Sequence, residues 1–212
     1  MGDRHARLYE SILNGDAAGA VSAAREALDA GSDPPSLIAD GITPAMKQAG
    51  RLFEEGEYFV PDLLMSARAT KGVFEILRPL LATTGAQPAG RVVLGTVTGD
   101  MHDIGKNLVA VMLEGGGFEV TDLGVDVPPD RFVAAVERSG ARLVGLSALL
   151  TTTLPAMKET LEAIRAASLH PGVKVLVGGA PVTAAYARAI GADGYAETAA
   201  AAVEEARRLI AT

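Results

Sequence analysis

The segment that decides the fold covers residues 91–105 and reads RVVLGTVTGDMHDIG. Its first seven residues form an apolar run, which suits a strand buried on both faces of a parallel sheet. The glycine-flanked loop that follows carries an Asp-x-His pattern, and a helix is expected from Ile104 onward. This order of strand, loop and helix predicts an exposed imidazole, His102, at the edge of a sheet, with the carboxylate of Asp100 beside it.

From this segment to the C-terminus, short apolar runs alternate with longer amphipathic ones. The apolar runs predict strands at residues 91–97, 119–123, 143–149, 174–177 and 194–195. Helices are expected at residues 104–113, 129–138, 154–167, 182–189 and 198–210. The alternation predicts an α/β domain over residues 91–212, with a doubly wound, flavodoxin-like sheet of five parallel strands and right-handed crossovers.

The part of the chain before this domain has a helical pattern. Apolar residues at helical spacing predict helices around residues 8–13, 16–30, 35–53 and 61–80, so residues 1–85 are expected to form a four-helix bundle cap. The stretch from Thr83 to Gly90 is rich in small residues, Gly and Pro, which is typical of a flexible linker.

Composition limits the possible partners and the possible chemistry. The net charge of −7 argues against nucleic acid, because phosphate binding needs a basic face. The sequence has no apolar stretch of 18 residues and no signal-like start, so we expect a soluble, cytoplasmic protein without membrane contact. Cysteine is absent, which excludes thiolate ligands and thiol nucleophiles. Among only three histidines, His102 is the natural metal donor, whereas His5 and His170 are expected at the surface.

Three loops are expected to converge where ligands bind in such folds, outside the carboxyl ends of the strands. The loop at residues 99–105 offers an imidazole, whose second ring nitrogen a carboxylate can hold. The loop at residues 147–153 offers hydroxyl groups, and Gly178-Gly179 lets a bulky ligand approach the backbone.

Each of these features also has a purely structural interpretation, and the residues alone leave both open. A lone loop histidine is more often solvated than ligating. Asp103, or one of the residues Thr151–Thr153, can cap the helix that follows it. The paired glycines suit an ordinary strand-to-helix turn. Phosphate loops fit less well, because five residues rather than four separate Gly99 from Gly105. No G-x-G-x-x-G follows the first strand, and no G-x-S-x-G is present.

Three short patterns, in order, resemble the signature of cobalamin-binding domains. They are Asp-x-His-x-x-Gly at residues 100–105, Ser-x-Leu at 147–149 and Gly-Gly at 178–179. In the first half, the stretch GRLFEEGEYFVPDLLMSA at residues 50–67 is similar to the helical cap of methionine synthase and of methyltransferase corrinoid proteins. The resemblance covers nearly the whole chain apart from its first several residues.

This resemblance implies roles for individual residues. His102 would replace the cofactor's own benzimidazole as the lower cobalt ligand, and Asp100 would accept a hydrogen bond from its far ring nitrogen. Methionine synthase completes this relay with a serine, and the aligned residue here is Thr153. The displaced nucleotide tail would run past Ser147 and the paired glycines towards Tyr195. The cofactor-binding residues implied in this way are Phe53, Phe59, Val60, Leu63, Gly99, Asp100, Met101, His102, Asp103, Ile104, Gly105, Ser147, Leu149, Thr151, Thr153, Gly178, Gly179 and Tyr195.

The apolar cap residues among these would shield the upper face of the corrin from water. For Phe53, an ordinary place in the bundle core is equally compatible with the sequence.

The resemblance also implies a function, that of a corrinoid protein with cobalamin as its cofactor. Such a chain would carry a methyl group on cobalt from a methanol, methylamine or methoxy donor to a folate or thiol acceptor. It would not be catalytic alone, and its partners would be a substrate:corrinoid methyltransferase, a corrinoid:acceptor methyltransferase and a reductive activase. A cobalamin-dependent sensor or regulator, a mutase subunit and a binding module without cofactor are the alternatives. We favour the carrier, because we find no DNA-binding module, basic patch or Trp.

Overall fold

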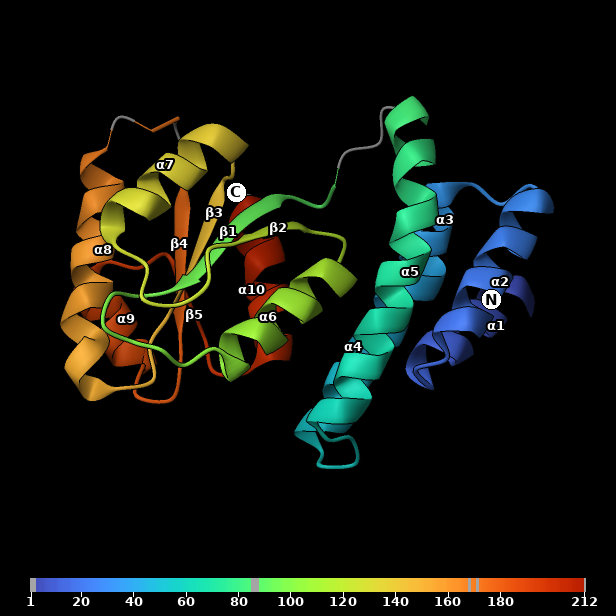
Figure 1. Ribbon diagram of the computed structural model, residues 1–212, viewed down its shortest axis with the longest axis horizontal. Helices are drawn as coiled ribbons and strands as arrows, with labels where there is room; N and C mark the ends of the chain where they lie inside the picture. The colour runs from blue at the N-terminus through green and yellow to red at the C-terminus, as the bar shows by residue number, and fades with distance from the viewer. Residues whose placement is uncertain (1–2, 85–87, 168, 171, 212) are drawn as a thin grey trace. The chain divides into compact units, whose positions relative to one another are not determined.

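The computed structural model describes residues 3–84, 88–167, 169–170 and 172–211 (Figure 1). The chain divides into two units, with the main boundary between Pro88 and Ala89. The first unit is helical and the second is an α/β domain, and each is described by itself. Among the described residues, no helix combines the length and the hydropathy that crossing a membrane would require.

The helical unit contains the predicted cap. Its elements are the α-helices α1 (Asp3–Leu13), α2 (Ala17–Asp29), α3 (Pro34–Leu37), α4 (Thr43–Glu54) and α5 (Val60–Thr84), with a π-helical turn, η1 (Ile38–Ile42), between α3 and α4. The third expected helix is therefore one run, α3-η1-α4, with a wider turn in its middle. Pro44 accounts for this turn, because it has no N–H to donate to the carbonyl of Asp40 and its ring crowds that carbonyl.

Helix α2 shows how sequence determines packing in this unit. Asp16 caps its start by accepting a hydrogen bond from the N–H of Gly19 at 2.9 Å. Its buried face consists of four alanines, so neighbouring helices can approach closely. The larger core residues come from the other helices and include Leu8, Ile12, Leu37, Ile42, Met46, Leu63, Val73 and Leu77.

Helix α5 continues further than the sequence suggested. Thr83 and Thr84, expected in the linker, are its last two residues. Helix-compatible residues follow Pro79, and the first glycine after it is Gly85, so nothing in the sequence ends the helix earlier. Residues 85–87 of the expected linker lie outside the described residues.

The second unit contains the predicted sheet of five parallel strands. These are β1 (Arg91–Thr96), β2 (Glu119–Asp122), β3 (Leu143–Ser147), β4 (Lys174–Gly178) and β5 (Gly194–Ala196), in the order β2-β1-β3-β4-β5. This is the flavodoxin-like order, whose reversal point lies between β1 and β3. The predicted fold class is therefore confirmed.

Helices cover both faces of the sheet (Figure 1). Helices α7 (Pro129–Ser139), α8 (Leu154–Ala166) and α9 (Ala184–Ile190) pack on one face, and α6 (Ile104–Gly115) and α10 (Ala199–Ile210) pack on the other. Alternate strand residues point to opposite faces, as Val93 and Val92 illustrate. Helix α9 begins two residues later than expected, because Thr183 is its cap and accepts a hydrogen bond from the N–H of Tyr186.

The strand register brings the three predicted loops to one edge of the sheet. Thr96 at the end of β1 pairs with Ser147 at the end of β3, and Ser147 pairs with Gly178 at the end of β4. The loops that follow these strands therefore leave the sheet side by side, at and next to the point where strand order reverses.

Candidate functional site

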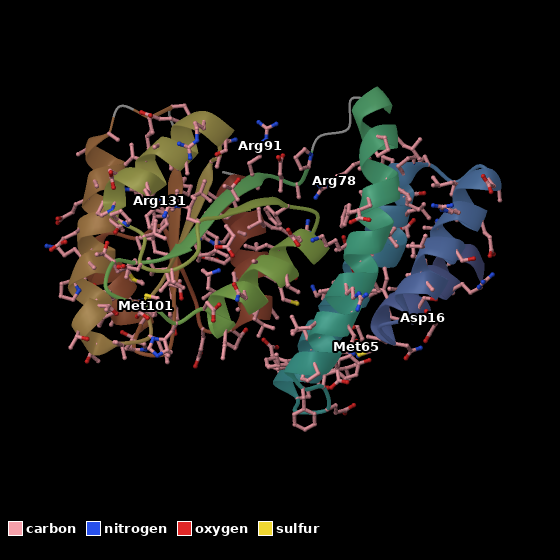
Figure 2. The ribbon with its side chains drawn as sticks, in the orientation of Figure 1. Asp16, Met65, Arg78, Arg91, Met101 and Arg131 are labelled. Atoms are coloured by element: carbon pink, nitrogen blue, oxygen red, sulfur yellow. The ribbon has the colours of Figure 1, made fainter. Side chains whose placement is uncertain are left out.

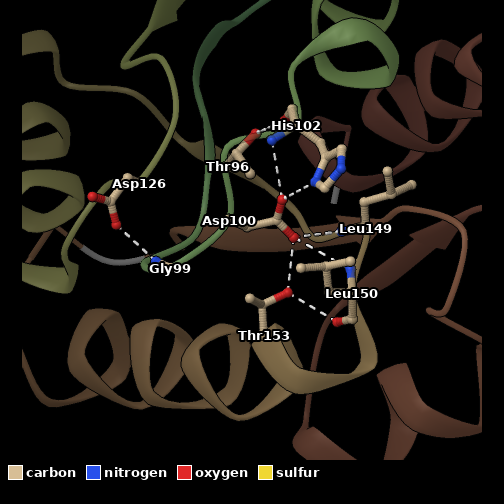
Figure 3. A network of polar contacts seen from close by, with 8 residues as sticks. All are labelled: Thr96, Gly99, Asp100, His102, Asp126, Leu149, Leu150 and Thr153. Atoms are coloured by element: carbon tan, nitrogen blue, oxygen red, sulfur yellow. Dashed lines mark hydrogen bonds and ion pairs between the residues drawn. The ribbon is translucent and has the colours of Figure 1, made fainter.

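The carboxylate of Asp100 accepts hydrogen bonds from the loop that follows β1 and from the loop that follows β3 (Figure 3). Asp100 is fully buried. Its Oδ1 accepts from the backbone N–H of His102 at 3.1 Å and lies 2.7 Å from Nδ1 of the same residue. Its Oδ2 accepts from the N–H of Leu149 at 2.7 Å, the hydroxyl of Thr153 at 2.8 Å and the N–H of Leu150 at 3.3 Å. Both oxygens are thus saturated with donors.

These contacts explain where strand β3 ends. The expected strand included Leu149, but β3 stops at Ser147 because the amides of Leu149 and Leu150 turn away from the sheet towards Asp100. Thr153 lies at the N-cap position of helix α8, as expected for one of Thr151–Thr153, but its hydroxyl makes no capping hydrogen bond and instead lies 2.8 Å from Asp100.

The same contacts determine which groups carry protons. Burial raises the pKa of Asp100, but hydrogen bonds from the Leu149 amide, His102 and Thr153 outweigh it and hold the pKa well below its usual range. Asp100 is therefore ionised at neutral pH and can only accept hydrogen bonds. We accordingly assign the proton of His102 to Nδ1, which donates to Asp100, and the lone pair to Nε2.

His102 presents that lone pair to the exterior. Half of its side chain is exposed, and in the described part of the chain Nε2 has no hydrogen-bond partner. The loop itself is fixed, because the hydroxyl of the buried Thr96 donates to the carbonyl of His102 at 2.9 Å. A neutral imidazole whose Nδ1–H is held by a carboxylate is the usual arrangement of a metal-ligating histidine.

The ligand set limits what kind of metal this histidine can hold. Within the described ranges, no group of three or more His, Cys, Asp or Glu side chains is placed to bind a metal ion. His102 would thus be the single protein ligand, which suits a metal that arrives already chelated in a macrocycle.

The surface around His102 is apolar. Met101 and Ile104 on its own loop are 69% and 73% exposed, and Leu149 and Leu150 on the next loop are 43% and 41% exposed. Figure 2 labels Met101 on the loop after β1. A group of large apolar side chains exposed to water is typical of a binding surface. A flat, largely apolar ring coordinated by His102 would cover them.

The third loop supplies close backbone contact. Gly179 has φ of 121°, and a Cβ on it would lie 1.9 Å from the carbonyl oxygen of Ala148, so only glycine fits. Gly178 is nearly as restricted, with the carbonyl oxygen of Ala196 3.0 Å from its hypothetical Cβ. Gly178 is the last residue of β4 and Gly179 begins the turn, so packing alone accounts for both glycines, and they also leave backbone rather than side chains at this edge. Tyr195 is half-buried and packs against the core on the side of α7, α8 and α9.

The candidate residues of the cap fall into two groups. Phe59 is 67% exposed and Phe53 and Val60 are half-buried, whereas Leu63 is only 1% exposed and belongs to the cap core. Leu64 and Met65, which were not among the candidates, are 45% and 51% exposed. Figure 2 labels Met65 on helix α5. Three large apolar residues in a row on one amphipathic helix were the signal, because only one of them can face the core.

Sequence reasoning also missed a buried cation beside the site. Lys106 on α6 is 3% exposed, and its Nζ donates to Asp122 at 2.5 Å and to Asn107 at 2.6 Å. The side chain of Asn107 in turn donates to Asp103 at 3.1 Å, which links this network to the loop that carries His102. The signal was a lysine in the first turn of a largely apolar helix, followed by an aspartate at the end of the next strand.

Fold and site together define a class of protein. It has a helical unit and an α/β domain, and the α/β domain offers one histidine nitrogen within an apolar surface. Two family models, each described as a B12 binding domain, match residues 90–204 and 4–78. The chain therefore belongs to the B12-binding family, which confirms the family resemblance found in the sequence.

Individual relatives agree with this assignment. Dimethylamine corrinoid protein 1 of Methanosarcina acetivorans is 45% identical over 91% of this chain and 91% of its own length. The crystal structure of a cobalamin-binding protein from Desulfitobacterium hafniense is 33% identical and covers 99% of both chains, with a TM-score of 0.80. A chain of the methanol:cobalamin methyltransferase complex from Methanosarcina barkeri is 32% identical over 99% of this chain and 80% of that chain, with a TM-score of 0.84.

Proposed function

We propose that this protein binds cobalamin or a related corrinoid through Nε2 of His102 and carries a methyl group between partner methyltransferases. The single observation that carries the proposal is the geometry of His102. Its Nδ1 lies 2.7 Å from the fully buried carboxylate of Asp100, and half of its side chain is exposed on a loop with exposed apolar residues. When bound, the cofactor supplies a cobalt atom on which the methyl group travels.

The residues around His102 fit a corrinoid of this kind. Asp100 holds the imidazole tautomer and orientation, and Thr153 adds the hydroxyl that completes the relay. The exposed side chains of Met101, Ile104 and Leu149 would pack against the lower face of the ring. The remaining loop residues would line the cofactor and its nucleotide tail; they are Gly99, Asp103, Gly105, Ser147, Thr151, Gly178, Gly179 and Tyr195.

A second part of the proposal concerns the helical cap. We propose residues 1–85 as the cap domain, whose apolar side chains would shield a bound cofactor from water, and residues 91–212 as the cobalamin-binding domain. The exposed apolar side chains of Phe59, Leu64 and Met65 support it, because a reactive cofactor face needs a surface that excludes water. Phe53 and Val60 would contribute through their exposed parts. The burial of Leu63 suggests that it supports the others from the cap core.

A carrier depends on other enzymes for catalysis. We propose three partners: a methyltransferase that loads the cofactor, a second that unloads it to a folate or thiol, and a reductive activase. The names of the relatives support this division, since one is a dimethylamine corrinoid protein and another is part of a methanol:cobalamin methyltransferase complex. Methanol, methylamines and methoxy compounds are the proposed donors, and the cytoplasm is the proposed location.

The axial ligand can be tested with a matched pair of histidine variants. The H102A protein should lose the spectrum of the base-off, His-on cofactor when it is reconstituted with hydroxocobalamin or methylcobalamin. The control is H170A, because His170 lies at the other end of β3, with Nε2 3.0 Å from the carbonyl of Ala141. H170A should keep the spectrum of the unchanged protein. If H102A and H170A gave the same His-on spectrum, the assignment of His102 would be wrong.

The proposed role as a carrier needs a second measurement. Holoprotein whose cofactor has first been reduced chemically should accept a methyl group from one of the donor classes only when the matching methyltransferase is present. Transfer is followed by the change in the cofactor's absorption spectrum, and H102A protein serves as the control. A protein that binds cobalamin but accepts a methyl group from no donor–methyltransferase pair would contradict the carrier function while leaving the cofactor assignment intact.

A further inference from the structure

The segment after strand β2 continues to pair with β1 beyond the end of β2. The N–H of Leu123 donates to the carbonyl of Leu94 at 2.8 Å, and the N–H of Thr96 donates to Gly124 at 3.0 Å. The N–H of Val127 donates back to Thr96 at 3.0 Å. Residues 123–127 therefore lie directly against the end of β1, where the loop that carries His102 begins.

Asp126 in this segment holds the start of that loop at two points. Its Oδ1 accepts from the N–H of Gly99 at 2.7 Å (Figure 3). Its own N–H donates to the carbonyl of Asp100 at 3.0 Å. One residue thus binds both sides of the Gly99–Asp100 unit, through a charged acceptor and a backbone donor.

The backbone of Asp126 is unusual for a residue with a side chain. Its φ is 51°, in the left-handed region, and it is the only residue other than glycine in the described ranges with a positive φ. Glycine adopts this conformation at less cost, whereas Asp and Asn tolerate it better than most other residues. A side chain retained where glycine would fit more easily points to a role for its carboxylate.

The contacts of Asp126 are connected through Asp100 to His102, the candidate metal ligand. The N–H of Asp100 donates to Val97 at 3.1 Å, so hydrogen bonds restrain Asp100 at its N–H, its carbonyl and its carboxylate. The same carboxylate oxygen receives both the backbone N–H and the ring Nδ1 of His102. Whatever orients the backbone of Asp100 therefore also orients the imidazole.

We propose that Asp126 is a positioning residue for the axial ligand. By holding Gly99 and Asp100, it sets the direction in which Nε2 of His102 faces the cofactor. The inference rests on the proposed function, because it assumes that His102 ligates cobalt. It goes beyond the Asp100–His102–Thr153 relay. Among the described residues Asp126 has no hydrogen bond to His102 or Thr153, and it acts through the backbone of Gly99 and Asp100.

Three variants separate positioning from a general structural role. D126G keeps the left-handed backbone accessible but removes the acceptor. D126N keeps both the backbone preference and a neutral acceptor, which forms a weaker hydrogen bond to the N–H of Gly99. D130N is the matched control, because Asp130 is an exposed carboxylate in the first turn of α7 and its change removes the same charge.

The first readout is the cofactor spectrum of holoprotein reconstituted with hydroxocobalamin. Circular dichroism first establishes that each variant is folded. D126G should lower the ratio of His-on to His-off cofactor by roughly tenfold, as expected for the loss of one charge-assisted hydrogen bond. D126N should lower it by about threefold, because its acceptor is neutral, and D130N should leave it unchanged.

The second readout uses protein without cofactor. The NMR signal of the Nδ1 proton of His102, identified by its absence in H102A, reports the hydrogen bond to Asp100. We expect D126G to shift or broaden this signal and D130N to leave it in place. The proposal is overturned if D126G matches D130N in both readouts, or, should D126G not fold, if D126N matches D130N.

The two proposals fail in different ways. If the unchanged protein shows no His-on spectrum, the proposed axial ligand is wrong, and the apoprotein signal still tests whether Asp126 orients His102. If the unchanged protein is His-on and D126G matches D130N in both readouts, only the positioning role is wrong.

Discussion

The loop that carries His102 and the cap segment at residues 59–65 offer two different kinds of surface. In the loop, a fully buried carboxylate receives hydrogen bonds from two loops, and a single ring nitrogen remains available. In the cap segment, Phe59, Leu64 and Met65 expose apolar side chains, and Leu63 anchors the helix in the cap core.

The difference suits the two surfaces to different tasks. Ligation depends on direction, so it calls for a rigid network in which each donor has its acceptor. Exclusion of water depends on apolar area and tolerates variation in shape. We therefore expect substitutions in the loop to change the state of the cofactor, and substitutions on the exposed face of the cap to leave the fold nearly intact.

The largest effect on stability should come from the anchored residue of the cap. L63A removes a side chain that is 1% exposed, so the free energy of unfolding should fall by about 2–5 kcal/mol through the loss of burial and the cavity left behind. The neighbouring change L64A removes a side chain that is 45% exposed and should cost much less. Urea denaturation of both variants measures the difference. Equal losses would contradict the division of this helix into a core face and an exposed face.

The next effect concerns Asp100. D100N keeps the shape of the side chain, but it places an NH₂ group against N–H and hydroxyl donors that in the unchanged protein bind a carboxylate oxygen. The free energy of unfolding should therefore fall by about 2–3 kcal/mol. The holoprotein should also lose most of its His-on spectrum, because the Nδ1 proton of His102 loses its charged acceptor. The exposed D130N change serves again as the control for charge. A D100N protein as stable as D130N would show that the network is not a source of stability.

The pH dependence of the same variant has a definite sign. The pKa of Asp100 is lowered on folding, so the folded state binds this proton less readily than the unfolded state does. The stabilisation is therefore present above the ordinary pKa of an aspartate and is lost as pH falls from there towards the lowered value. The free energy of unfolding, measured by denaturation at a series of pH values from 7 down to about 3, should depend less on pH for D100N than for the unchanged protein. Parallel curves would contradict the lowered pKa.

These predictions also mark how far the sequence determines the fold. The approximate positions of the strands followed from local patterns, because buried parallel strands read as apolar runs separated by helical periods. The end of β3 was placed two residues too late, because the residues there are apolar and only their amides turn to Asp100, 49 and 50 positions earlier in the chain. Local periodicity carries no information about such a distant acceptor.

The candidate site, too, could be predicted only in part from the sequence. The relay of Asp100, His102 and Thr153 was reached through the resemblance to a family, and the structure brings these residues within hydrogen-bond distance of one another. Lys106 and Asp126 were missed, because their importance lies in partners 16 and 27 positions away. Which face of helix α5 is exposed was equally hidden, since Leu63 and Leu64 are identical in type and differ only in direction.

The smallest effect is expected at Thr153, where the relay meets helix α8. Its hydroxyl lies 2.8 Å from Asp100 and 2.9 Å from the carbonyl of Leu150, yet it has one proton and can donate to only one of them at a time. Asp100 keeps its other donors in T153V, so unfolding should cost only about 1 kcal/mol less and part of the His-on spectrum should remain.

T153S retains the hydroxyl and should stay closer to the unchanged protein in both measurements. T152V is the matched control, because Thr152 is exposed in the same turn. If T153V is no less stable than T152V and equally His-on, the hydroxyl has no part in the relay. Ligation would then depend on the carboxylate and backbone amides alone, which would narrow the directional part of this site to Asp100, His102 and the loops that hold them.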